Sequence, residues 1–251
     1  RLLENGVTAF LPTTITMPKE RIWKALDNIR INMEKPSLGA CILGAHLEGP
    51  FISPKRKGAH LESEIVKPDI SIIKDYLDMI KIITIAPEVQ GGLEFIKEII
   101  KQKTTVLSIG HSDATYEEAI KVIDEGVASA THVFNAMTGL NHREPGVVGA
   151  VLTTDIFCEL ISDLIHVHPA AFSILLKSKG MDKIVLITDS IRAASMGDGI
   201  YDLGDQSVEI SCGCAKLKDG TLAGSVVKLN EAIRNFMKST GCDLCNAVAM
   251  A

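Results

Sequence analysis

Short apolar runs alternate with amphipathic helical patterns along most of this chain, and this alternation limits its possible folds more than any other feature. Several runs are apolar on both faces, as expected for strands buried in a parallel sheet. The expected strands are 7–11, 40–47, 81–86, 105–109, 127–131, 147–152, 157–161 and 183–188. The expected helices are 19–33, 69–77, 92–101, 115–125 and 169–177. Such alternation, with mostly short connections, indicates parallel βαβ units.

The number of expected strands favours a (β/α)₈ barrel over an open doubly wound sheet. A single α/β barrel routinely has a length close to 251 residues. A glycine-rich phosphate loop, which many open sheets carry after their first strand, is absent from the sequence. Short polar, glycine-rich stretches over 197–224 predict a hairpin insertion, followed by a final helix at about 226–239. We therefore expect one barrel domain over residues 1–251.

Composition argues against several classes of function. An aromatic content of 4% argues against a β-sandwich and against a surface that stacks nucleic-acid bases. The net charge of -5 provides no general attraction for nucleic acid or an anionic membrane. No apolar stretch approaches the roughly 20 residues of a membrane span. The expected partner is therefore a small molecule, with neither nucleic acid nor membrane involved.

The six cysteines are too sparse for a disulfide framework and favour reduced thiols in a cytoplasmic protein. Cys212 with Cys214, and Cys242 with Cys245, leave a zinc knuckle as an alternative. No ribbon-type turn surrounds either pair. We expect a polar hairpin around the first pair, and small helix or loop residues at the second.

Two histidines, His111 and His132, each follow an expected strand, with one expected helix between them. The pair therefore spans one βα unit, and the carboxyl ends of adjacent parallel strands lie side by side where ligands bind. Glu48 ends another expected strand, just before a Gly-Pro turn. One carboxylate and two imidazoles suit Zn²⁺ or Fe²⁺ with an open position for water. Three unrelated polar residues at strand ends are the alternative.

Further candidates lie at or beyond the ends of other expected strands. Asp189 could take a proton from water and return it to a leaving group, or it could simply cap a turn. His60 lies on a long loop and either faces substrate or stays exposed. One of His166 and His168 is expected to contact substrate. The two together resemble a metal-binding HxH motif only superficially, because Pro169 begins a helix directly after them.

A possible anion site follows His132 in the sequence. Arg143 lies in a loop bounded by glycine and proline, where its guanidinium could bind a phosphate through two hydrogen bonds. Asn135 and Ala136 would offer amide donors to the same anion. An ordinary surface loop around Arg143 is the alternative.

Taken in order, these segments resemble one known family, the N-acetylglucosamine-6-phosphate deacetylases of the amidohydrolase superfamily. Three motifs are the most specific: HLEGPF, GHSDA and THVFNAM. The matching segments are 6–16, 44–60, 85–88, 109–119, 131–150, 166–170, 187–190 and 222–225. The resemblance therefore extends over essentially the whole chain.

The resemblance implies a deformed (β/α)₈ barrel that hydrolyses N-acetylglucosamine 6-phosphate to glucosamine 6-phosphate and acetate. It assigns a divalent metal to Glu48, His111 and His132, acid/base catalysis to Asp189, contacts with the sugar and the acetamide carbonyl to His60 and His166, and the 6-phosphate to Asn135, Ala136 and Arg143. In family members the arginine reaches across a subunit interface, which implies a homodimer.

The sequence also departs from the family pattern. The first barrel strand, with its metal-binding residue pair, and most of a small β-sandwich domain would precede Arg1 or draw on later residues. A second metal ion would depend on that strand. The usual DGxH reads Asp163-Leu164-Ile165-His166, and the usual TDA ends in Ser190.

Two other functions stay open at this point. The first is a different amidohydrolase, such as an N-acetylgalactosamine-6-phosphate deacetylase. The second is a non-catalytic sugar-phosphate binding protein. The presence of the metal-binding set together with Asp189 argues against the second.

Overall fold

The computed structural model describes residues 1–35 and 39–251, in which strands and helices alternate from β4 to β8. The strands are β1 (Ala9–Phe10), β2 (Cys41–Ile42), β3 (Ala45–Glu48), β4 (Ile80–Ile85), β5 (Val106–Ile109), β6 (Ser129–Ala130), β7 (Phe157–Ile161), β8 (Ile184–Ile187), β9 (Gly199–Leu203), β10 (Gln206–Ser211) and β11 (Cys214–Leu217). The helices are α1 (Lys19–Met33), α2 (Gly92–Gln102), α3 (Tyr116–Glu125), α4 (Gly146–Thr153), α5 (Pro169–Lys179), α6 (Leu229–Thr240) and α7 (Leu244–Ala249).

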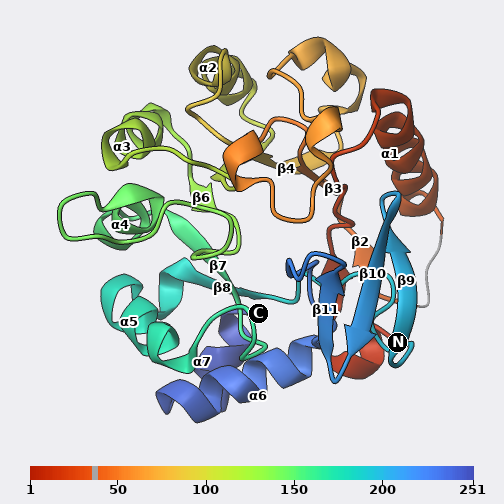
Figure 1. Cartoon of the computed structure of the whole chain (residues 1–251), viewed down its shortest axis with the longest axis vertical. Helices are drawn as coiled ribbons and strands as arrows, with labels where there is room; N and C mark the ends of the chain where they lie inside the picture. Colours follow the sequence, from red (N-terminus) through yellow and green to blue (C-terminus); the bar gives the residue numbers. More distant parts are fainter. Residues whose placement is uncertain (36–38) are drawn as a thin grey trace.

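Six parallel strands, β3 to β8, form the main sheet in the same order as in the sequence. Figure 1 shows that this sheet curls into an arc, with α2 to α5 along its outer side. Strands β1 and β2 form a separate short parallel pair. The parallel α/β architecture expected from the alternation is confirmed, as a curled half-barrel. The carboxyl ends of its parallel strands lie on one side of the sheet, where a site is expected.

Local sequence explains where the helices begin and end. Helix α3 starts with a capping box, in which Thr115 and Glu118 each accept a hydrogen bond from the other's backbone N–H. Helix α5 begins with Pro169 in its first turn, and the His168 side chain accepts a hydrogen bond from the Ala170 N–H. The expected starts of these two helices are confirmed to within one residue.

Two expectations about secondary structure are wrong. Residues 147–152 form most of α4 rather than a strand. Helix α4 is buried on nearly all sides and packs between α3 and α5, so its apolar run has no helical periodicity to distinguish it from a buried strand. The helix expected over 69–77 is two short 3₁₀ turns, because the Asp69 carboxylate accepts a hydrogen bond from Ser71 N–H and closes a tight turn.

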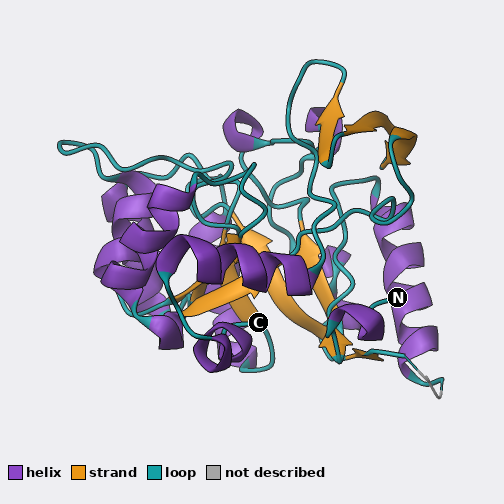
Figure 2. Ribbon diagram, turned by 90° about the horizontal axis from the view of Figure 1, so that it is seen from below, coloured by secondary structure: helices purple, strands orange, loops and turns teal. Residues whose placement is uncertain are grey.

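The glycine-rich region over 197–224 contains the antiparallel sheet β9–β10–β11, which confirms the expected hairpin insertion. In Figure 2 this sheet lies on the same side of the main sheet as the loops. Gln206 donates a hydrogen bond to the Ala59 carbonyl, and Asp205 forms an ion pair with Arg21 of α1. The insertion is thereby tied to the loop after β3 and to α1.

The main core lies between the curled sheet and its surrounding helices. It includes the fully buried side chains of Leu47, Ile83 and Ile109 from the strands, and of Ile96 and Phe172 from the helices. Burial of such side chains stabilises the sheet by roughly 1.5–3 kcal/mol each. In the part of the chain that the structure describes, no helix is both long and apolar enough to cross a membrane.

Candidate active site

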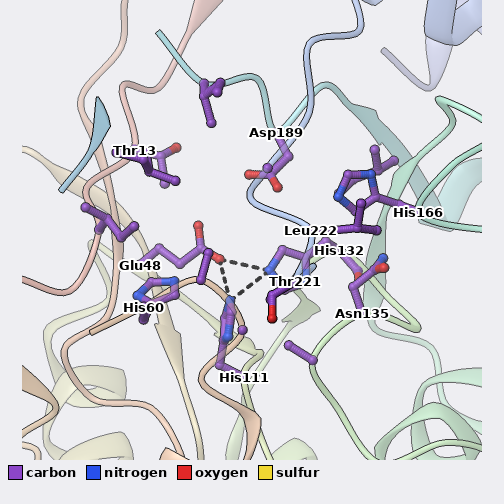
Figure 3. A pocket seen from close by; sticks show the side chains of 18 of the residues that line it. Thr13, Glu48, His60, His111, His132, Asn135, His166, Asp189, Thr221 and Leu222 are labelled. Carbon is purple, nitrogen blue, oxygen red and sulfur yellow. Dashed lines mark hydrogen bonds and ion pairs between the residues drawn. The ribbon is translucent and has the colours of Figure 1, made fainter. Parts of the chain in front are cut away.

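A cavity of about 640 Å³ opens at the carboxyl ends of the parallel strands, within the usual size range for small-molecule sites. The residues that the sequence analysis assigned to the site, with the exception of Arg143, line this cavity: Glu48, His60, His111, His132, Asn135, Ala136, His166 and Asp189. They come from segments far apart in the sequence. Figure 3 shows Glu48, His111 and His132 together, with Asp189 facing the same space.

Glu48, His111 and His132 bring three potential metal-binding atoms together. Glu48 Oε1 lies 2.8 Å from His132 Nε2 and 3.0 Å from His111 Nε2, and the two nitrogens are 3.1 Å apart. Donor atoms that share one zinc-like ion are about 3.0–3.5 Å from each other. Among the described residues, no other group of three His, Cys, Asp or Glu side chains places its ligand atoms within 4.8 Å of one another.

The hydrogen bonding of His111 fits a cation at this position. His111 Nδ1 donates to the Arg56 carbonyl at 2.8 Å, so Nε2 of the neutral ring carries a lone pair. That lone pair faces the Glu48 carboxylate. While His111 is neutral, only His132 Nε2 can carry a proton that lies between these three atoms. A divalent cation would satisfy all three at once, and the buried donor set is chemically suited to hold one.

Charges in this group are strongly coupled. Burial alone would raise the pKa of Glu48, but its close contacts with the His111 and His132 rings hold it well below its usual value. Burial alone would lower the pKa of His132, but the hydrogen bond and charge of Glu48 outweigh it and raise this pKa to about 9. The metal-free group therefore contains an ionised Glu48 and a protonated His132 at neutral pH.

Three of the cavity residues occupy equivalent positions in their βα units. His111, His132 and Asp189 each lie two residues after the end of β5, β6 and β8, respectively. Each has a left-handed backbone, with φ of 48°, 30° and 48°. Such backbone costs a residue other than glycine on the order of 1–3 kcal/mol and tends to occur at functional sites.

Asp189 places a partly buried carboxylate in this cavity. Burial, together with the negative charge of Glu48, raises the pKa of Asp189 to about 7. The LAGS segment holds its backbone, because Ser225 N–H donates to the Asp189 carbonyl at 2.8 Å. Gly224 packs against the same carbonyl, which an added Cβ would approach to 3.0 Å. An acid poised near neutrality can both accept and release a proton.

His60 and His166 line opposite sides of the cavity (Figure 3). Burial lowers the pKa of His60 to about 3, so its ring is neutral. His166 Nδ1 lies 2.6 Å from Asp163 Oδ2, and this carboxylate also accepts hydrogen bonds from two backbone N–H groups. Burial alone would raise the pKa of Asp163, but its hydrogen bonds with His166 lower it. The ionised Asp163 fixes the orientation of His166.

Leu164 takes the place of the glycine that is usual in the DGxH motif. Its φ is 68°, in the left-handed region that favours glycine, and its side chain is exposed. The chain therefore keeps the motif's backbone shape at some conformational cost.

The residues expected to hold a phosphate are only partly brought together. Asn135 and Ala136 line the cavity. Asn135 Nδ2 donates to the His132 carbonyl at 3.1 Å, which ties it to the metal-binding group. Arg143 lies on an exposed loop and does not line the cavity.

Other sequence hypotheses have simpler outcomes. The side chain of His168 caps α5. Among the described residues the cysteines form no group with metal-binding spacing, and all of them are free thiols. Cys212 and Cys214 flank the β10–β11 turn, as expected for a polar hairpin. The zinc knuckle is therefore absent from the part of the chain that the structure describes.

Sequence reasoning missed two supporting carboxylates. Glu159 lies within apolar strand β7, where its carboxylate accepts a hydrogen bond from the His132 N–H at 3.3 Å and burial raises its pKa to about 7. Asp113 accepts a hydrogen bond from Arg56 Nε at 2.8 Å, and the Arg56 carbonyl in turn orients His111. The sequence could have revealed Glu159, because a glutamate inside an apolar strand is unusual. The contact of Asp113 with Arg56 has no local sequence signature.

The fold and site together define a class: an α/β protein with a buried carboxylate–bis-histidine metal-binding group beside a partly buried aspartate. Residues 1–251 match the model of the amidohydrolase family. The chain belongs to this family.

Two similar proteins show which enzymes the sequence resembles. The chain is 44% identical to the N-acetylglucosamine-6-phosphate deacetylase of Bacillus subtilis (strain 168), with 96% of the chain and 63% of that protein covered. It is 40% identical to the N-acetylgalactosamine-6-phosphate deacetylase of Escherichia coli O157:H7, with 98% and 66% covered. The chain thus spans just under two thirds of the length of these relatives.

A solved structure shows the same similarity in three dimensions. The N-acetylglucosamine-6-phosphate deacetylase of Thermotoga maritima superimposes with a TM-score of 0.93 at 40% identity, covering 99% of this chain and 68% of that one. The family resemblance inferred from the motifs is confirmed.

Proposed function

We propose that this chain is the main part of the catalytic domain of an N-acetylglucosamine-6-phosphate deacetylase. The observation that carries this proposal is the convergence of Glu48, His111 and His132 within 3.1 Å of one another, in a cavity that also contains Asp189. The names of similar proteins support the substrate. The reaction converts an acetamide and water into an amine and acetate.

Glu48, His111 and His132 would hold the metal, with Zn²⁺ or Fe²⁺ as the candidates for this oxygen and nitrogen set. When bound, such an ion supplies Lewis-acid activation of water and of the amide carbonyl. The Arg56 carbonyl keeps His111 in the tautomer that a ligand needs, and Glu159 supports the backbone at His132.

Asp189 would move the proton. As water attacks the acetamide carbon, the Asp189 carboxylate accepts a proton from it. The protonated acid then gives that proton to the departing nitrogen as the carbon–nitrogen bond breaks. A pKa of about 7 suits both steps, because neither protonation state is strongly favoured at neutral pH.

His60 and His166 would contact the sugar and the acetamide group from the two sides of the cavity. Asn135 and Ala136 would bind the 6-phosphate from the end of the cavity that they line. The exposed position of Arg143 supports a phosphate contact made across a homodimer interface, since Arg143 does not line the cavity of its own chain. A closed (β/α)₈ barrel, completed by a further strand, is part of the same proposal. So is a cytoplasmic location, which the free thiols support.

The test is acetate release by the metal-loaded chain on two substrates, N-acetylglucosamine 6-phosphate and its galactosamine epimer. We expect faster turnover of the glucosamine compound and dependence on Glu48. Equal or faster turnover of the epimer would overturn the choice of sugar, which the Escherichia coli relative makes the leading alternative. No turnover of either, with metal bound, would point to a binding protein.

A further inference from the structure

The segment 6–16 matched the family without receiving a role, and its last residue, Thr16, contacts the cavity residue His60. Thr16 is almost fully buried, at 1% exposure, and its backbone N–H donates to His60 Nδ1 at 3.1 Å. A backbone N–H can only donate, so His60 Nδ1 must carry a lone pair. The Thr16 hydroxyl, whose oxygen lies 2.7 Å from the same nitrogen, therefore donates to it as well.

We propose that Thr16 is a positioning residue, which holds His60 in the tautomer protonated at Nε2 so that His60 presents a neutral N–H donor to the cavity. This inference rests on the proposed function, because it assigns His60 a role toward that substrate. With Nδ1 occupied and Nε2 protonated, His60 has no lone pair free to bind a metal or accept a proton.

The surroundings hold this arrangement firmly. The backbone N–H of His60 donates to the Lys57 carbonyl at 3.0 Å. The side chain of Gln206, from the inserted sheet, donates to the Ala59 carbonyl. Gly49 leaves space for the contact, since an added Cβ there would lie 2.0 Å from Thr16 Oγ1 and 3.2 Å from His60 Nδ1. The glycine of the HLEGPF motif is thus required by the Thr16–His60 hydrogen bond.

The opposite edge of the ring faces the site. His60 lines the cavity, and within the described residues its Nε2 has no hydrogen-bond partner. Its ring lies edge-on to that of the candidate ligand His111, with centroids 4.4 Å apart. A fixed N–H donor beside a metal-binding group is placed to bind an oxygen that gains negative charge, such as the carbonyl oxygen of an amide under attack.

The first experiment reads the tautomer directly. ¹⁵N NMR of the full chain at neutral pH, with the His60 signals identified by their loss in His60→Gln, should show Nδ1 unprotonated and Nε2 protonated. A protonated Nδ1, or an average of the two tautomers, overturns the proposal. This measurement needs no turnover, so it stands even if the proposed function fails.

The second experiment tests the role in catalysis with the metal-loaded chain and N-acetylglucosamine 6-phosphate. Thr16→Val should lower kcat roughly 10-fold with little change in KM or metal content, and Thr16→Ser should restore it. The matched control is Thr105→Val, which loses a hydroxyl bonded to the Ile80 carbonyl in a different part of the sheet. Thr16→Val indistinguishable from this control would overturn the positioning role.

Two substitutions of His60 separate a donor from an acid or base. The amide nitrogen of Gln can occupy the position of Nε2, whereas that of Asn is closer to Nδ1. We expect His60→Gln to keep at least roughly 10-fold more kcat than His60→Asn, as for the retention of one oxyanion donor. Equal losses in both variants, with wild-type turnover intact, would contradict a donor role. Absence of wild-type turnover would instead reject the proposed function.

Discussion

The metal-free chain should become less stable between pH 7 and pH 10 because of His132. Its pKa is raised from 6.5 to about 9 by Glu48, whose charge and hydrogen bond outweigh the opposing effect of burial. A group with a raised pKa binds its proton more tightly in the folded state. Its stabilising contribution is therefore complete below pH 6.5 and is lost as pH rises through 9.

The size of the effect follows from the same values. A rise in the pKa from 6.5 to about 9 corresponds to about 3 kcal/mol of unfolding free energy. Most of this contribution is still present at pH 7 and nearly none remains at pH 10. For a protein of this size, the loss should lower the melting temperature by about 5–10 °C.

The assay is thermal unfolding of the chelator-treated chain at several pH values from 7 to 10. His132→Gln is the matched control, because it removes the titrating ring while other ionisable side chains remain. Asp189 and Glu159, with pKa values of about 7, complete most of their titration near the start of this range. Parallel curves for the wild type and the variant would refute the assignment of a proton to the Glu48–His132 pair.

Three further predictions concern single side chains. Asp189→Asn should lower kcat by about 10²–10⁴-fold while the metal content, measured by elemental analysis, is unchanged. Asp113→Asn should weaken metal affinity by about 10-fold in a chelator competition, because the Arg56 carbonyl that orients His111 loses its anchor. Lys179→Met should lower the free energy of unfolding in urea by about 1–3 kcal/mol, because the carbonyls of Val151 and Thr154 at the end of α4 lose their donor.

Each of these has an outcome that would contradict it. Near-normal turnover of Asp189→Asn would remove Asp189 from proton transfer. Metal affinity in Asp113→Asn equal to that of the exposed-surface control Asp124→Asn would show that the Arg56 anchor is dispensable. A Lys179→Met chain as stable as the wild type would mean that burial of the ammonium group costs as much as its two hydrogen bonds contribute.

Much of the fold was predictable because strands and helices here have strong local signals. The alternation of apolar runs identified the parallel strands, and the spacing of His111 and His132 identified adjacent ones, which β5 and β6 confirm. Helix α4 was missed because it is buried on nearly all sides and its apolar residues show no period. Periodicity records the contrast between a buried and an exposed face, so it fails where both faces are buried.

The candidate site was predictable in its residue types but not in its protonation. Strand-end histidines and carboxylates could be read from their positions after apolar runs, and family motifs added His60 and His166. The roles of Thr16 and Asp113 could not be read in this way. Each acts through a contact with a residue more than 40 positions away, such as the contact between Thr16 and His60.

The sequence by itself determined the order of the βα units, the residue types at the strand ends and the family. These follow from patterns that extend over a few residues, where propensity and side-chain periodicity act. Only the tertiary structure decided that Glu48 and His132, 84 residues apart, approach to 2.8 Å. It also decided that the Thr16 N–H donates to His60 Nδ1 and that Arg143 lies outside the cavity of its own chain. Distances, burial and hydrogen-bond direction depend on how distant segments pack, and no local pattern encodes them.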